Sequence, residues 1–306
     1  GVDRWLAELA RAEGRRLVTM IRLEAPALTA TINPLGAELT SLRDAEGREM
    51  MTDADPAFWT GRAPLLFPVV GGLVGDRYRL DGVDYALPRH GFARRMDFAL
   101  VEHQPDRAVL RLTDTEATRA VYPFAFTFDA EFRIEGHVLV MALTVTNRSD
   151  RDMPASLGYH PAFAWPLPYG QPRAAHRILF DEAELDSLAQ LGDGLIVSGD
   201  RPSPVAGRML ALDDALFTED ALIWTALRSR GCLYGPADGQ QLRLDWSDMP
   251  SLGIWTKPGA AYVCIEPWDG HADPAGFAGE IWEKPGIRRI APGESVAHWM
   301  RVTLPR

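Results

Sequence analysis

The chain has 306 residues, a formal net charge of −10, and side chains that are 46% hydrophobic and 24% charged. This composition is typical of a soluble globular protein and excludes a disordered or fibrous chain, and no apolar run reaches the ~20 residues that span a bilayer. The acidic charge disfavours nucleic acid as a partner, and it disfavours anionic substrates unless a local arginine pocket overrides it.

The first predicted element is an amphipathic helix over residues 2–16, with Trp5 and Leu9 near one face. Residues 1–19 are therefore interpreted as an N-terminal helical extension, and Met20 is an alternative initiator. No secretory signal is visible, so we expect a cytoplasmic protein.

Short strands account for most of the remaining chain. The Asp-Gly pair at 81–82 lies between two alternating runs and predicts a β-hairpin over residues 78–85. The strand predicted at 138–147 is apolar on both faces, which is typical of a strand covered on both sides. The other strands are predicted at residues 28–33, 38–43, 109–114, 125–134, 241–246, 252–255, 261–265 and 296–304.

Helices are few, and the two predicted after the N-terminal extension cover residues 181–190 and 213–222. Strands and turns are spread evenly over residues 20–306, without a Ser/Gly/Pro-rich linker, so the sequence predicts a single all-β domain. Two cysteines exclude a disulfide scaffold and a cysteine-based zinc site. Motifs for nucleotide loops and helical zinc sites are missing, so we expect neither a cofactor nor a metal.

Three polar segments interrupt the apolar strands. His90 and Arg94 stand beside Gly and Pro just after a strand, and His160 precedes a proline in an aromatic stretch. Glu266 ends an apolar strand, where burial of a carboxylate is costly unless it is paired or functional. Each histidine taken alone is more often a hydrogen-bonded core residue than a catalyst. Together, the three segments indicate a polar cleft.

Aromatic residues accompany these polar groups, and the combination suits a sugar. The C–H faces of a sugar stack on aromatic rings, while its hydroxyls take hydrogen bonds. The aromatic residues available for stacking are Trp268, Trp165, Phe92 and Tyr159.

Four segments in chain order resemble the aldose 1-epimerase, or galactose mutarotase-like, superfamily, and most closely its LacX-type branch. They are 67–71 (FPVVG), 90–94 (HGFAR), 158–163 (GYHPAF) and 264–270 (CIEPWDG). The resemblance covers residues 24–305. It implies a β-supersandwich, which is a large antiparallel β-sandwich with few short helices and a sugar site in a cleft on one face.

The resemblance also implies roles for the residues that match its motifs. Glu266 stands at the position of the catalytic base, His160 at that of the general acid, and His90 at that of a histidine that binds the sugar near its ring oxygen. The expected substrate-binding residues are His90, Arg94, Trp268, Phe92 and Asp269.

One position departs from the pattern of the LacX-type branch. Such sequences often read FPIVGRL where this chain has FPVVGGL, so Gly72 stands where a sugar-contacting arginine is expected. Either Arg62 or Arg77 substitutes for it, or the substrate differs. For the second sugar-binding carboxylate of true galactose mutarotases, the candidates are Asp245 and Asp269.

Exchange of α and β anomers fits this set of residues chemically. One group must take the O1 proton while another gives a proton to the ring oxygen, and no cofactor, metal or covalent intermediate is needed. Burial would raise the pKa of Glu266 toward neutrality and make it a better base. We expect His160 and Glu266 to lie roughly 5–8 Å apart, at opposite edges of one sugar ring. Cys264 should be structural, because an activated thiolate needs an electropositive setting.

The leading hypothesis is a cofactor-free, aldose 1-epimerase-like isomerase that acts on a hexose or a related monosaccharide. One alternative is a hexose-6-phosphate 1-epimerase, which needs an arginine cluster for the phosphate. The nearest candidates for that cluster are Arg89, Arg94 and Arg95. A second alternative is a non-catalytic carbohydrate-binding or sensing protein on the same fold.

Overall fold

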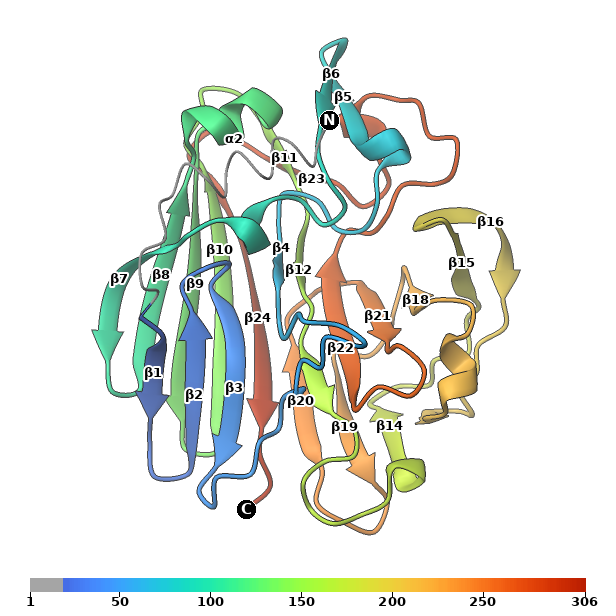
Figure 1. Ribbon diagram of the computed structural model, residues 1–306. Coiled ribbons are helices and arrows are strands. Elements are labelled where there is room, and N and C mark those ends of the chain that lie inside the picture. The colour runs from blue at the N-terminus through green and yellow to red at the C-terminus, as the bar shows by residue number, and fades with distance from the viewer. Residues whose placement is uncertain (1–18) are drawn as a thin grey trace.

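The computed structural model describes residues 19–306, and the helix predicted at 2–16 lies outside this range. Antiparallel strands dominate the described chain, and a single α-helix lies within it (Figure 1). None of the helices in residues 19–306 has the length and apolar character needed to cross a membrane. The all-β prediction is confirmed.

A nine-stranded sheet has the order β17-β14-β19-β20-β24-β10-β9-β8-β7. One of its interior strands, β10 (Val138–Asn147), has the predicted bounds and pairs with β9 (Phe126–Glu135) and β24 (Ser295–Thr303). The other strands are β7 (Ala99–Gln104), β8 (Arg107–Thr113), β14 (His176–Phe180), β17 (Met209–Ala211), β19 (Gly231–Pro236) and β20 (Leu242–Trp246).

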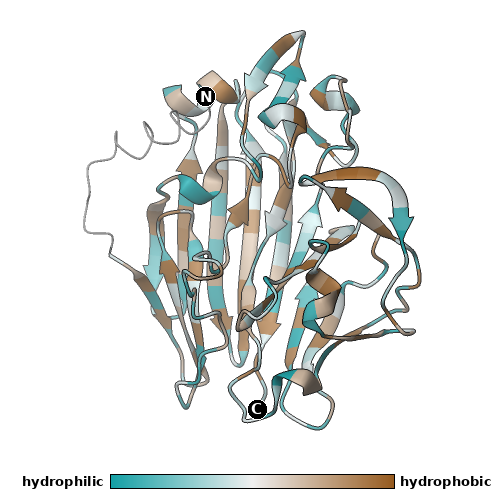
Figure 2. Cartoon of the chain, turned by 45° about the vertical axis from the view of Figure 1, so that its right-hand side comes forward, coloured by the Kyte–Doolittle hydropathy of each residue, from teal (hydrophilic) through white to brown (hydrophobic). Residues whose placement is uncertain are grey.

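The two faces of β10 are covered unequally. Leu139 and Leu143 on one face are buried, whereas Ala142 and Thr144 on the other are half-buried. The expectation that both faces are covered therefore holds only in part. Alternation of hydrophobic and hydrophilic residues along many strands is visible in Figure 2, as expected for a sheet with one face on the core.

An eight-stranded sheet carries two of the three predicted polar segments, those around His160 and Glu266. Its order is β16-β15-β18-β21-β22-β12-β4, and β13 also pairs with β22. Every residue of β22 (Tyr262–Asp269) is buried, and the strand runs four residues beyond its predicted end. The other strands are β4 (Leu65–Leu66), β12 (Leu157–Tyr159), β13 (Ala162–Ala164), β15 (Leu188–Gly192), β16 (Leu195–Arg201), β18 (Leu222–Trp224) and β21 (Ser251–Trp255).

Smaller elements complete the described chain. A three-stranded sheet consists of β1 (Ile21–Glu24), β2 (Leu28–Asn33) and β3 (Glu38–Asp44), and β11 (Met153–Ala155) pairs with β23 (Arg288–Ile290). The predicted hairpin is confirmed as β5 (Arg77–Leu80) and β6 (Val83–Ala86), with Asp81 and Gly82 at positive φ. Short 3-10 helices lie at Val74–Asp76, Ala93–Arg95, Arg173–Ala175, Asp214–Phe217 and Ile281–Glu283.

The helix predictions are wrong in detail. No helix covers 181–190, where β15 begins and where the buried Glu184 carboxylate accepts the backbone N–H of Ser229. The helix predicted at 213–222 is only the short 3-10 turn that precedes β18. The helix α2 (Glu116–Val121) was not predicted, although Thr115 and Thr118 form a reciprocal cap at its start.

Aromatic residues fix two of the motif segments in the core. The ring of Phe67 packs edge-on against Phe92 and Tyr122, with ring centroids 5.9 and 5.8 Å apart. Gly91, at φ +71°, lies so close to Phe67 that an added Cβ would meet its carbonyl oxygen at 2.1 Å. This close approach holds the HGFAR segment against the segment FPVVG.

Candidate active site

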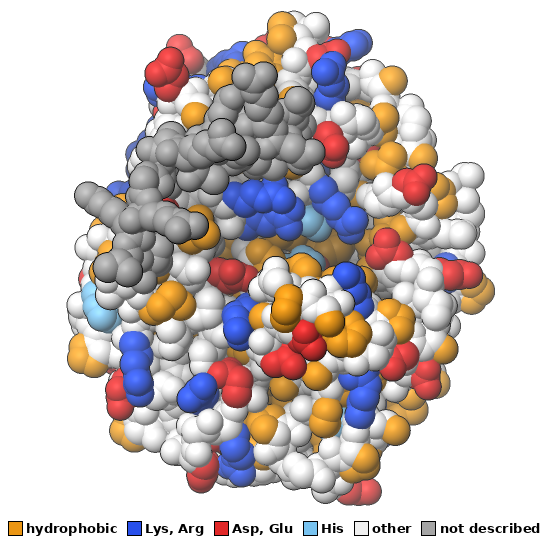
Figure 3. Space-filling model, viewed as in Figure 1, with side chains coloured by type: hydrophobic (Ala, Val, Ile, Leu, Met, Phe, Trp, Pro, Cys, Tyr) orange, Lys and Arg blue, Asp and Glu red, His pale blue; other side chains and the backbone are white. Residues whose placement is uncertain are grey.

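A cavity of about 510 Å³ opens beside β21 and β22. Figure 3 shows a hollow with basic side chains at its edge and histidines within it. Its titratable lining side chains come from segments far apart in the sequence: Arg89, His90, Arg94, His160, Asp220, Lys257 and Glu266. Three tryptophans, Trp59, Trp255 and Trp268, also line it.

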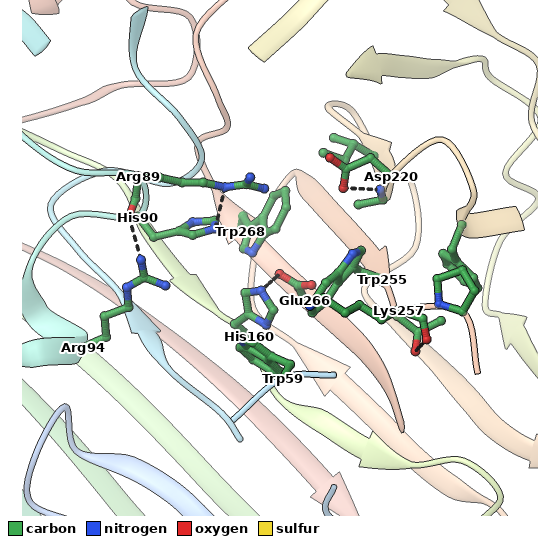
Figure 4. Close-up of a pocket in the computed structure, with 15 residues that line it drawn as sticks. Trp59, Arg89, His90, Arg94, His160, Asp220, Trp255, Lys257, Glu266 and Trp268 are labelled. Atoms are coloured by element: carbon green, nitrogen blue, oxygen red, sulfur yellow. Dashed lines mark hydrogen bonds and ion pairs between the residues drawn. The ribbon is translucent and has the colours of Figure 1, made fainter. Parts of the chain in front are cut away.

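His160 and Glu266 are in contact at the centre of this cavity (Figure 4). His160 Nε2 lies 3.1 Å from Glu266 Oε2, although the contact is not aligned as a hydrogen bond. The predicted separation of 5–8 Å is therefore wrong. β12 and β13, on either side of His160, both pair with β22, and the N–H of Ile265 donates to the carbonyl of Pro161. This pairing brings the imidazole beside the carboxyl.

Burial acts on these two groups in opposite directions. It raises the pKa of Glu266 well above its usual value, and it lowers the pKa of His160 to about 3. Both shifts favour the uncharged form of the side chain, so a pair with a neutral imidazole and one exchangeable carboxyl proton is the form that burial stabilises. The expected rise of the Glu266 pKa thus has its expected cause, which is desolvation.

His90 lies on the wall next to this pair. Its ring centroid is 5.7 Å from that of His160, and burial lowers its pKa well below the usual value. The backbone N–H of Gly71 donates to His90 Nδ1 at 3.0 Å, so the neutral ring carries its proton on Nε2. That Nε2–H is available as a donor to a bound ligand.

Two of the expected substrate contacts lie elsewhere. Phe92 is fully buried in the aromatic core and does not line the cavity. Asp269 is buried on β22, where its carboxylate accepts from His298 at 2.7 Å and from Arg288 at 2.8 Å. Because side chains alternate along a strand, Glu266 and Trp268 face the cavity while Asp269 does not.

Other candidates from the sequence also lie outside the cavity. Trp165 and Tyr159 are core residues, and Asp245 forms an ion pair with Arg243. Arg95 is exposed beside the cavity but is not part of its lining. These side chains are therefore unavailable to a ligand in this cavity.

Neither proposed substitute for the arginine expected at position 72 reaches the cavity. Arg62 donates to the backbone carbonyls of Thr40 and Thr52, and Arg77 lines a different, smaller cavity. A Cβ on Gly72 would lie 2.9 Å from the carbonyl of Gly194. The guanidinium that approaches Gly194 is that of Arg89, with Nη1 3.2 Å from a Cβ placed there. Arg89 thus supplies a guanidinium to this part of the cavity.

Several lining residues were missed as site residues, among them two tryptophans and two charged side chains. Trp59 packs on His160 with ring centroids 4.9 Å apart, and it meets Trp255 edge-on at 5.4 Å. Asp220 has a positive φ of 75°, and Lys257 belongs to a Lys-Pro-Gly turn that was read only as punctuation. Nothing in the sequence around a single lysine or tryptophan near a turn indicates that the residue lines a functional site.

The two central residues of the cavity, together with a buried cysteine behind them, could hold a metal ion. Ligand atoms of His160, Cys264 and Glu266 all lie within 4.8 Å of one another. However, burial raises the pKa of the Cys264 thiol and of the Glu266 carboxyl, so both keep protons that a metal would have to displace. The arrangement fits proton transfer better than metal coordination.

Most of the sequence matches a known protein family. The family model of aldose 1-epimerases matches residues 19–303. The chain belongs to the aldose 1-epimerase family. The chromosomal protein LacX of Lactococcus lactis subsp. lactis is 31% identical over 283 residues, which cover 89% of this chain and 95% of LacX. The predicted membership of the aldose 1-epimerase superfamily, LacX-type, is confirmed.

Solved structures share the fold as well. A galactose mutarotase related enzyme from Lactobacillus acidophilus has a TM-score of 0.87 at 31% identity, covering 94% of this chain and 98% of its own. A galactose mutarotase-like protein from Lactobacillus casei has a TM-score of 0.86 at 28% identity, covering 94% and 100%. The predicted galactose mutarotase-like fold is therefore confirmed for this aldose 1-epimerase family member.

Proposed function

We propose that this protein is a cofactor-free isomerase that interconverts the α and β anomers of a monosaccharide. The observation that carries the proposal is the contact between His160 and Glu266 at the centre of the cavity. An acid and a base in contact can exchange a proton with two neighbouring substrate oxygens. O1 and the ring oxygen are bonded to the same carbon, C1, so the two groups need not lie at opposite edges of the sugar.

The reaction needs one proton on this pair. Transfer of that proton from Glu266 to His160 gives a carboxylate and an imidazolium without changing the total charge. The carboxylate then takes the O1 proton while the imidazolium protonates the ring oxygen; the bond from C1 to the ring oxygen breaks as the C1=O1 bond forms. Rotation about C1–C2 and the reverse steps on the other carbonyl face give the second anomer, and the pair returns to its starting state.

Anomer exchange can be measured directly by NMR on a set of free and phosphorylated hexoses and hexuronates. Glu266→Gln keeps the shape but removes the proton-transfer group, so exchange should fall by ~10²–10⁴-fold while sugar binding persists. His160→Gln should have a similar effect, and the double variant should lose little more than the worse single one, because an acid–base pair acts as a unit.

Cys264→Ser is the matched control for these variants. In the parent protein the Cys264 thiol is buried next to Glu266 but does not line the cavity. Burial raises the pKa of this thiol, so no thiolate is expected. Exchange in this variant should stay within a few-fold of the parent. Sugar binding without faster exchange in the parent would instead favour a carbohydrate-binding or sensing protein. The cytoplasmic location stays a prediction.

A further inference from the structure

The cavity of this acidic protein is basic. Three cations, Arg89, Arg94 and Lys257, line it against only two carboxyl groups, Asp220 and the buried Glu266. Within residues 19–306, no carboxylate lies at ion-pair distance from any of the three cations. Figure 4 places Arg89 and Arg94 on the side of His90, and Lys257 across the cavity from them. The cavity therefore carries a net positive charge on a chain whose formal charge is −10.

Hydrogen-bond donors on the His90 side face one another without an acceptor. His90 Nδ1 is occupied by the N–H of Gly71, so Nε2 carries the ring proton. The Nε of Arg89 lies 3.4 Å from this same Nε2. Two N–H groups cannot hydrogen-bond to each other. An oxygen atom of a ligand placed between them could accept a hydrogen bond from both.

Arg94 adds a third donor to this wall. Its Nη2 donates to the carbonyl of Arg89 at 3.1 Å, while its buried Nε has no hydrogen-bond partner among the described residues. Burial, followed by repulsion from Arg95 and Arg89, lowers the pKa of Arg94 to about 10. An anion beside Arg94 would offset both effects, because it supplies an acceptor and an opposite charge.

We infer that the substrate is an anionic sugar, whose phosphate or carboxylate group is bound by Arg89, Arg94 and the Nε2–H of His90. The inference rests on the proposed function and names the substrate class of the same site. O1 must be free for the ring to open, so the anionic group belongs elsewhere. Carbon 6 is the one carbon of a hexopyranose outside the ring, which points to a hexose 6-phosphate or a hexuronate.

The distance between the two parts of the site agrees with this placement. The His90 and His160 rings lie 5.7 Å apart between centroids, so the anion-binding wall and the acid–base pair are within reach of one sugar ring. The ring oxygen joins C1 to C5, and C5 carries carbon 6. A sugar with C1 at the His160–Glu266 pair can therefore present its carbon 6 group to Arg89.

The test compares the exchange rates of glucose, glucose 6-phosphate and glucuronate with the full chain at low salt. We expect kcat/KM for at least one anionic sugar to exceed that for glucose by tenfold or more. Arg89→Gln should lower kcat/KM for that anion by about 10- to 100-fold, since a charge-assisted hydrogen bond is lost. Its effect on glucose should be at least threefold smaller than its effect on that anion. A preference for the phosphate or for the carboxylate identifies which anion is bound.

The matched control is Arg95→Gln. Arg95 follows Arg94 in the chain and carries the same charge, but it is exposed and outside the cavity lining. This variant should leave the ratio of kcat/KM for the anionic sugar to kcat/KM for glucose unchanged. If Arg89→Gln and Arg95→Gln lower kcat/KM for the anionic sugar equally, the inference is overturned. Such a result would mean that only the overall positive charge of this surface affects the rate.

Failure of the inference and failure of the proposed function give different results. Exchange of glucose as fast as that of both anions, with equal effects of Arg89→Gln on all three, overturns the inference and leaves the isomerase standing. Absence of exchange for every sugar overturns the proposed function. In that case the inference is tested by titration calorimetry. Glucose 6-phosphate or glucuronate should bind to the parent protein, and its affinity should be at least tenfold lower for the Arg89→Gln variant. If neither anion binds, the inference is overturned.

Discussion

The pKa shifts of His160 and Glu266 have consequences for the pH dependence of the reaction. An ordinary glutamate base would lose its proton near pH 4.5, and activity would then rise with pH through that value. Here burial raises the pKa of Glu266 well above that value, so the carboxyl proton is lost only at a higher pH. Because exchange needs one proton on the pair, its rate should not rise through pH 4.5 but should fall as the pH increases through the raised pKa of Glu266.

A profile of kcat/KM from pH 5 to pH 10 checks this expectation. A rate that increases through pH 4.5–5.5 and then stays level at high pH would contradict it. The assay should be followed by circular dichroism at each pH, so that loss of folded protein is separated from loss of the proton.

The buried imidazole of His160 should also make the fold sensitive to acid. Its pKa is about 3 in the folded chain and near 6.5 in an unfolded one. Between these values the unfolded chain binds a proton that the folded chain does not, so the free energy of unfolding falls as the pH is lowered from 6.5 toward 3. His160→Gln should remove this contribution, which is at most about 1.4 kcal/mol per pH unit.

Urea unfolding at a series of pH values measures that slope. The control is His103→Gln, because His103 lies exposed on β7 and away from the cavity. If His160→Gln and His103→Gln change the slope equally, the imidazole of His160 is not held neutral by burial.

At the scale of elements, β21 and β22 position the site together. Gly253 on β21 lies opposite Glu266, and an added Cβ would come within 2.5 Å of the ring of Trp268. Gly253→Ala should therefore displace Trp268 in the cavity and raise KM several-fold, with a smaller effect on kcat. Ile254→Val changes the neighbouring core residue and should cost about 0.5–1.5 kcal/mol of stability without changing KM. A KM effect of the same size in both variants would argue against the role of Gly253.

The sequence predicted where strands and turns lie better than it predicted which way individual side chains point. The Asp-Gly hairpin and the strand 138–147 were predictable, because turn chemistry and alternation are local properties. The helix expected at 181–190 was wrong because the Glu184 carboxylate binds backbone from a distant strand, which no local pattern reveals.

The same distinction applies to the candidate site. His90, Arg94, His160, Glu266 and Trp268 were predicted and all line one cavity. Phe92 and Asp269 belong to the same motifs but point into the protein, because burial and strand alternation decide which neighbours face a ligand. The contact of His160 with Glu266 depends on the pairing of β13 with β22, which the sequence does not display.

At the scale of the whole molecule, a buried ion pair joins distant parts of the chain. Lys284 Nζ lies 2.8 Å from Asp273 Oδ1, and Asp273 Oδ2 accepts the backbone N–H of Val74. Lys284→Met removes the cation and leaves a buried carboxylate, which should cost about 3–5 kcal/mol in urea unfolding. Arg22→Ala at an exposed ion pair is the control and should cost less than about 1 kcal/mol. If both substitutions lower the free energy of unfolding equally, burial of the Lys284–Asp273 pair does not determine its contribution to stability.

The two lysines of the chain, Lys257 and Lys284, differ completely in their access to solvent. The side chain of Lys284 is fully buried and engaged with Asp273, whereas Lys257 is exposed at the cavity. An amine-reactive dye should therefore label one side chain, at the mouth of the cavity, together with the terminal amine. A fluorophore attached there would report ligand entry without engineered cysteines, because this family member carries its own attachment point beside the site.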